Sequence, residues 1–235
     1  MDRRAFIFGI GSLAASLPSS SRAQHLRLDS PAVRAWTNIP SIVVVAPAND
    51  PRLPAVREAI EFWNGQLAKL ASPFRLGGTS RVVGMIPAND IHALRSNFTG
   101  RAPLKIPDSI QRVHSDVIVA LSDIDMAKFN PVTFSWSSPQ RAVVAIPTHR
   151  SLTPGLARNI MAHEFGHVIG LDHNADLTAL MCGGSGTRCQ FAAPREGFLS
   201  LTGADKAKIL EMYPLTWEPI GPSKRFKGDP PVTAG

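Results

Sequence analysis

The sequence predicts an α+β fold, in which helices pack on a twisted, mixed β-sheet of about five strands. Short apolar runs rich in β-branched residues, such as residues 41–46 (SIVVVA) and 116–121 (DVIVAL), are typical of buried strands. Between residues 53 and 70, apolar side chains recur at spacings of three and four, which is typical of one helix face. Further strands and helices follow, and this order favours one mixed sheet covered by helices.

The composition excludes several classes of protein. The chain has 235 residues, 44% of them hydrophobic and 18% charged, which is unlike a disordered polymer, a coiled coil or a collagen. No apolar run approaches the length of about 18 residues that a membrane-spanning helix needs. The net charge is +7, but the basic residues are scattered, so we expect no nucleic-acid partner.

The N-terminus has the pattern of an export signal, which predicts a secreted or periplasmic protein. In residues 1–23, Arg3 and Arg4 precede an apolar stretch at residues 5–17, and small residues precede a cleavage point after Ala23. The paired arginines leave both the twin-arginine route and the ordinary secretory route open. The alternative is an amphipathic first helix. No stable membrane insertion is expected once the signal is removed.

We expect residues 24–214 to form a single domain that begins with a polar lead-in at residues 24–40. A helix is expected to start with Asp50 as its cap and Pro51 at its first position. Its apolar face contains Trp63, which is expected in the core. Residues 87–113 are rich in proline and predict a loop. Strands are expected on either side of the helix, at residues 41–46, 74–76 and 81–86.

The second half predicts more strands and then two helices. One helix is expected to begin with Thr153 as its N-terminal cap and Pro154 at its first position. Thr202 and Asp205 form a capping-box-like pair at the start of the last helix, which Pro214 ends. A proline-rich, basic tail follows at residues 215–235. The strands expected before these helices are residues 116–121, 133–136 and 141–146.

An eleven-residue segment with the sequence HEFGHVIGLDH begins at His163. On a helix, His163 and His167 lie on one face and can bind one metal ion, and Glu164 lies beside that ion without being a ligand. Gly170 can adopt a positive φ, end the helix and return His173 towards the same ion. Three neutral imidazoles with an open fourth position predict one catalytic zinc ion rather than a structural one.

This segment resembles the extended zinc motif of the metzincin metalloproteases, and most closely that of the matrixins. The resemblance implies a metzincin-like fold, with an active-site helix, a C-terminal helix and zinc in a cleft between two subdomains. It also implies that Met181, in the run Ala-Leu-Met, is the methionine of the turn beneath the metal. The chain departs from the matrixin pattern at Asn174, where matrixins have Ser, and at Cys182-Gly183, which replaces Tyr-Pro.

Cys182 and Cys189 are the two cysteines of the chain. An even number in an exported protein predicts one disulfide. The alternative is two free thiols or a thiolate metal site, for which no nearby sequence supplies further ligands. No structural calcium or second zinc ion is expected, because the remaining candidate ligands are scattered: His114, His149, Asp123 and Asp125.

These features together predict a secreted zinc-dependent endopeptidase. Zinc would lower the pKa of a bound water, and Glu164 would act as general base and pass the proton to the leaving amine. A polypeptide substrate is expected to bind as an extended strand at a sheet edge, either residues 133–136 or residues 141–146. Two alternatives stay open: a secreted non-catalytic zinc-binding recognition module, and a non-peptidase zinc amidohydrolase.

Overall fold

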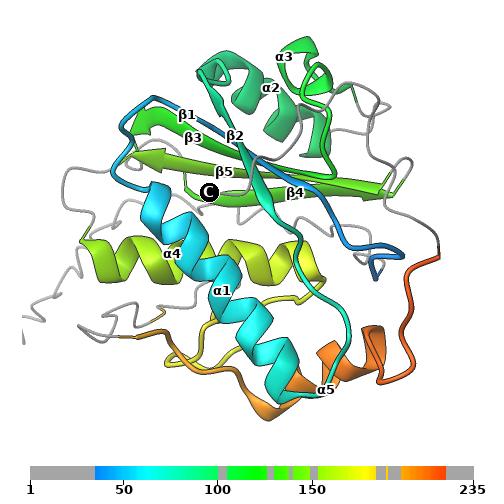
Figure 1. Ribbon diagram of the computed structural model, residues 1–235. Helices are drawn as coiled ribbons and strands as arrows, with labels where there is room; N and C mark the ends of the chain where they lie inside the picture. Colours follow the sequence, from blue (N-terminus) through cyan, green and yellow to red (C-terminus); the bar gives the residue numbers. More distant parts are fainter. Residues whose placement is uncertain are drawn as a thin grey trace, which may run out of the picture.

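The computed structural model has one mixed sheet of five strands, in the order β2-β1-β3-β5-β4 (Figure 1). Neighbouring strands are parallel except β4, which is antiparallel to β5 and forms one outer edge. The structure describes residues 35–99, 105–125, 130–137, 140–148, 153–183, 189 and 197–220, so the expected signal peptide lies outside the described residues. The strands are β1 (Ile42–Ala46), β2 (Thr79–Val83), β3 (Val117–Asp125), β4 (Val132–Ser137) and β5 (Gln140–Thr148).

Helices cover both faces of the sheet. Helices α1 (Leu53–Lys69) and α4 (Pro154–Ile169) pack together on one face, and α2 (Ala88–Thr99) and α3 (Asp108–Gln111) lie on the other (Figure 1). Because side chains alternate along a strand, the central strands contribute to two cores. Val44 and Val119 belong to the core under α1 and α4, whereas Val43 and Ile118 belong to the core under α2. The near-continuous apolar runs of β1, β3 and β5 follow from this burial on both faces.

Two expectations around α1 need correction. The helix begins at Leu53 rather than next to Asp50, whose carboxylate instead accepts hydrogen bonds from the main chain and guanidinium of Arg52. Residues 74–76 do not form a strand. The Asn64 side chain makes both main-chain hydrogen bonds of Leu76, at 3.1 and 2.8 Å, and so takes the place of a neighbouring strand. Trp63 is fully buried, as expected.

The expectation of a loop at residues 87–113 is also wrong, because α2 and α3 lie there. Pro87 and Pro107 precede these helices and their carbonyls accept the first helical hydrogen bonds. Proline is favourable at a helix start, where its missing N–H is not needed. Ile91 and Leu94 of α2 are fully buried against the sheet.

The two ends of the described chain meet below the C-terminus of α4. Trp36, in the segment expected to be a polar lead-in, is 4% exposed and donates its indole N–H to the Val168 carbonyl at 2.8 Å. The Tyr213 hydroxyl, just after α5 (Gly203–Met212), donates to the Ile169 carbonyl at 2.7 Å. Both bonds satisfy carbonyls that a helix end leaves without a partner. Trp217 donates to the Trp36 carbonyl, so the first residues of the expected tail contact the core. Among the described residues, no helix has the length and apolar character required to span a membrane.

Candidate metal centre

Helix α4 fixes two of the three expected histidine ligands. The helix starts as expected, with the Thr153 side chain accepting a hydrogen bond from the Leu156 N–H and Pro154 following it. It ends at Gly170, which adopts a left-handed conformation with φ 112°. This conformation is accessible to glycine at little cost, and it reverses the chain immediately after the helix. The following residues therefore return His173 to the face that carries His163 and His167.

The three histidines, named here the histidine cluster (His163, His167 and His173), bring their Nε2 atoms together. The Nε2 of His173 lies 3.2 Å from that of His163 and 3.1 Å from that of His167. The Nδ1 atoms of His163 and His167 lie 2.7 Å from main-chain carbonyls, which fixes their N–H there and leaves a lone pair on each Nε2. Lone pairs that face one another repel unless a cation lies between them. In a tetrahedral zinc site with bonds of about 2.0–2.1 Å, the nitrogens lie about 3.3 Å apart, so the cluster fits zinc.

The segment after the third histidine folds back beneath the cluster. The Leu180 carbonyl accepts from His163 Nδ1, and Met181 is fully buried against Gly166 of α4. A side chain at Gly166 would overlap the Met181 thioether, which explains the glycine between the two helical histidines. Gly183 lies against the His173 ring in the same way, and a Cβ there would overlap the imidazole.

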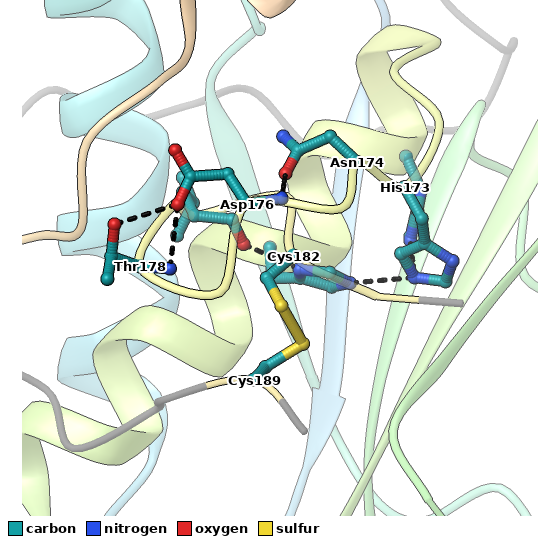
Figure 2. The surroundings of a disulfide bond; sticks show 9 residues. His173, Asn174, Asp176, Thr178, Cys182 and Cys189 are labelled. Atoms are coloured by element: carbon teal, nitrogen blue, oxygen red, sulfur yellow. Dashed lines mark hydrogen bonds between the residues drawn. A yellow bond between two sulfur atoms is a disulfide. The ribbon is translucent and has the colours of Figure 1, made fainter. Parts of the chain in front are cut away.

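The disulfide expected between Cys182 and Cys189 is present and lies beside the histidine cluster (Figure 2). Cys182 directly precedes Gly183, so the disulfide tethers the chain at the point where it contacts the His173 ring. Cys182 is 1% exposed. No described cysteine is free.

Glu164 borders the two cavities beside the histidine cluster and is 4% exposed. Its Oε2 accepts a hydrogen bond of 2.7 Å from the Thr133 hydroxyl of β4. Burial raises the pKa of Glu164 to about 7, and the Thr133 hydrogen bond opposes this change only in part. A carboxyl group with a pKa near neutrality can exchange protons at physiological pH.

The histidines have lowered pKa values. Burial is the main cause for His163 and His167, and for His167 the neighbouring histidines add to it. His173 is more exposed than the other two, but loss of solvation, followed by the neighbouring His163, lowers its pKa to about 4. Neutral imidazoles are the form that binds zinc, so the cluster is ready to bind metal at neutral pH.

Two cavities border the cluster on different sides. One, of about 530 Å³, is mainly apolar and is lined by Leu156, Ile160 and the Cys182–Cys189 disulfide. The other, of about 260 Å³, is lined by β4, by Arg95 of α2 and by Asp172. Both include Glu164 and His173 in their walls. The histidine cluster is therefore bordered by one apolar cavity and by one that contains the charged residues Arg95 and Asp172.

Sequence patterns predicted that the histidines, Glu164 and Gly170 lie near one another, and the resemblance to matrixins implied the same of Met181. The structure brings these residues together. The roles of Thr133, Arg95 and Gly183 were not predicted. Arg95 lay in the segment expected to be a loop, and Thr133 in a strand whose contact with α4 depends on the tertiary fold. For Gly183 the sequence did contain an indication, because this chain has glycine at the position where matrixins have proline.

Comparisons with known proteins find similar chains among solved structures. No family model matches the chain, and no curated protein matches it. Among solved structures, it is similar to archaemetzincin from Methanopyrus kandleri, with 12% identity, 75% of this chain and 96% of that chain covered, and a TM-score of 0.38. It is also similar to a zinc-dependent peptidase from Methanocorpusculum labreanum, with 14% identity, coverage of 72% and 99%, and a TM-score of 0.34. At these values the functional conclusion depends on the residues of the site itself.

Proposed function

We propose that the chain is an exported zinc-dependent endopeptidase of the metzincin type, with a matrixin-like segment from His163 to Met181. One observation carries the proposal: three converging imidazoles adjoin a buried carboxylate in a cleft beside an outer sheet strand. The histidine cluster would hold one zinc ion. When bound, zinc supplies Lewis acidity that promotes ionisation of water and polarises a carbonyl group.

Glu164 is the residue that moves protons in this mechanism. The Thr133 hydroxyl occupies one carboxylate oxygen, and the other, Oε1, is the one that takes up the proton of the attacking water. Glu164 then gives this proton to the nitrogen of the leaving amine. A pKa close to neutrality suits both transfers. The only tyrosine, Tyr213, bonds to the Ile169 carbonyl and has no part in the reaction.

The outer edge of the sheet supports binding of an extended polypeptide. Of the two strands expected as candidates, β5 lies between β3 and β4, whereas β4 is the last strand and lines the cleft through Val132, Thr133 and Ser135. We propose that the substrate adds a strand to β4, above the cleft between the sheet and the segment that follows α4. The apolar cavity would accept a large apolar side chain, and the cavity with Arg95 a polar or acidic one.

Export is proposed from the signal pattern at residues 1–23, and the disulfide is consistent with an oxidising compartment.

The test is hydrolysis of an unstructured protein by the chain from Gln24 onward. Wild type, wild type with a zinc chelator, and Glu164→Ala are compared, and the zinc content of each is measured. We expect cleavage by untreated wild type alone, with zinc retained in Glu164→Ala. A zinc-loaded, folded wild type that cuts no polypeptide would favour a recognition module, and preference for a small amide would favour a non-peptidase hydrolase.

A further inference from the structure

The third histidine is held differently from the other two. His163 and His167 belong to one helix, and their Nδ1 atoms bond to main-chain carbonyls. His173 follows the helix, is exposed, and has no hydrogen bond at Nδ1 within the described part of the chain. Metal-binding histidines normally have such a bond, which orients the ring. The position of His173 must therefore depend on the main chain beside it.

Asn174 fixes that main chain. Its N–H donates to the Met181 carbonyl at 2.8 Å, and its carbonyl accepts from the Gly183 N–H at 3.1 Å. Its side-chain Oδ1 accepts from the Asp176 N–H at 3.1 Å, a bond drawn in Figure 2. The residue next to His173 thus joins both sides of the loop that returns beneath the cluster.

The remaining polar group of Asn174 reaches the C-terminal helix. Its Nδ2 donates to both carboxylate oxygens of Asp205, at 3.3 and 3.1 Å. Asp205 is 5% exposed, and its Oδ2 also accepts from the Thr202 N–H at 2.8 Å in the capping box of α5. A charged acceptor makes such a bond stronger than one between neutral groups. The first turn of α5 is therefore connected to His173 through one side chain.

We propose that Asn174 and Asp205 are positioning residues that set the affinity of the histidine cluster for zinc, by holding the main chain that carries His173. This inference rests on the proposed metal site and extends it to α5, a helix that contributes no ligand. Loss of the bond would free the loop beside His173, and the cluster would then have to order its third ligand on binding zinc. Substitution of such outer partners typically costs about 10–100-fold in metal affinity.

The experiment compares three variants by zinc affinity, from competition with a chelator of known affinity, and by the melting temperature of the metal-free protein. Asn174→Ala removes the bond. The double variant Asn174→Asp with Asp205→Asn exchanges donor and acceptor, keeps the net charge, and can still accept from the Thr202 and Asp176 N–H groups. Thr202→Ala is the matched control, because it removes the Thr202 side-chain bond to the Asp205 N–H but leaves the Asp205 carboxylate in place.

We expect Asn174→Ala to bind zinc about 10–100-fold more weakly than wild type, and the double variant to recover to within about threefold. Thr202→Ala should lower the melting temperature by about 2–4 °C and leave zinc affinity unchanged. Three results would each overturn the inference: zinc affinity of Asn174→Ala equal to that of wild type, no recovery of affinity in the double variant, or a loss of affinity in Thr202→Ala as large as in Asn174→Ala. A folded wild type that binds no zinc would instead overturn the proposed function. Because affinity is measured without a substrate, the outcome does not depend on peptidase activity.

Discussion

The buried carboxyl group of Glu164 should destabilise the metal-free fold at high pH, and Glu164→Gln should remove this effect. Burial raises its pKa from 4.5 to about 7. Between these values, the folded state keeps a proton that the unfolded state has lost, so the free energy of unfolding falls as pH rises. A pKa difference of about 2.5, at about 1.4 kcal/mol for each unit, corresponds to about 3 kcal/mol above pH 7.

Glutamine has nearly the same shape and no charge, and its amide oxygen can still accept from the Thr133 hydroxyl. We therefore expect Glu164→Gln to be more stable than wild type by about 2–4 kcal/mol at pH 8, and by little at pH 4. The lowered pKa values of the histidine cluster also make stability depend on pH. This contribution is shared by both proteins, so it largely cancels when they are compared at one pH.

The assay is urea unfolding of both proteins at pH 4, 6 and 8 in the presence of a strong chelator. Glu61→Gln is the control, because the Glu61 side chain is 68% exposed on α1 and its substitution should change stability by less than about 0.5 kcal/mol at any pH. An equal stability of Glu164→Gln and wild type at pH 8 would refute the reasoning. So would a gain of the same size at pH 4 and pH 8, because it would have a cause other than ionisation.

Three further predictions concern residues that contact the histidine cluster or stabilise the segments around it. Gly183→Ala should weaken zinc binding strongly in a chelator competition, because the new Cβ overlaps an imidazole of the histidine cluster, whereas Gly78→Ala meets no atom and should have no effect. Trp36→Phe should lower the free energy of unfolding in urea by about 1–3 kcal/mol, because it leaves a carbonyl at the end of α4 without its donor; a loss below 0.5 kcal/mol would contradict that role. The double variant Cys182→Ser and Cys189→Ser removes the disulfide, which joins cysteines 7 residues apart in the sequence. Its free energy of unfolding should be about 2–3 kcal/mol lower than that of wild type under non-reducing conditions. Under reducing conditions the difference between the two proteins should disappear.

Features set by residues close together in the sequence could be predicted. The cap at Thr153, the reversal at Gly170 and the return of His173 all lie within one helix and the turn that follows it. The buried strands were also predicted, because their apolar runs record burial on both faces directly. Helix α2 was missed, since the prolines around it were interpreted as breaking structure when one of them starts the helix.

Contacts between distant segments could not be predicted from such patterns. Nothing local to Trp36 indicates that its indole satisfies a carbonyl of α4, 132 residues away. The same holds for Asn64, which replaces a strand partner for Leu76 by using a side chain. In both cases a polar group meets an unsatisfied backbone group, and the pairing is decided by which surfaces pack together rather than by spacing.

For Glu164, the difference between local and long-range determinants affects function. Its place beside the histidine cluster follows from one step along a helix, so the sequence suffices to predict it. Its pKa does not follow from spacing, because it is raised by burial in the folded chain and lowered by a hydrogen bond from Thr133 of β4, which is 31 residues away. The position of the carboxylate is thus a local property, and its readiness to exchange a proton is a property of the whole fold. A variant that moves β4 without touching the histidine cluster should therefore retain zinc affinity and change the pH dependence of cleavage.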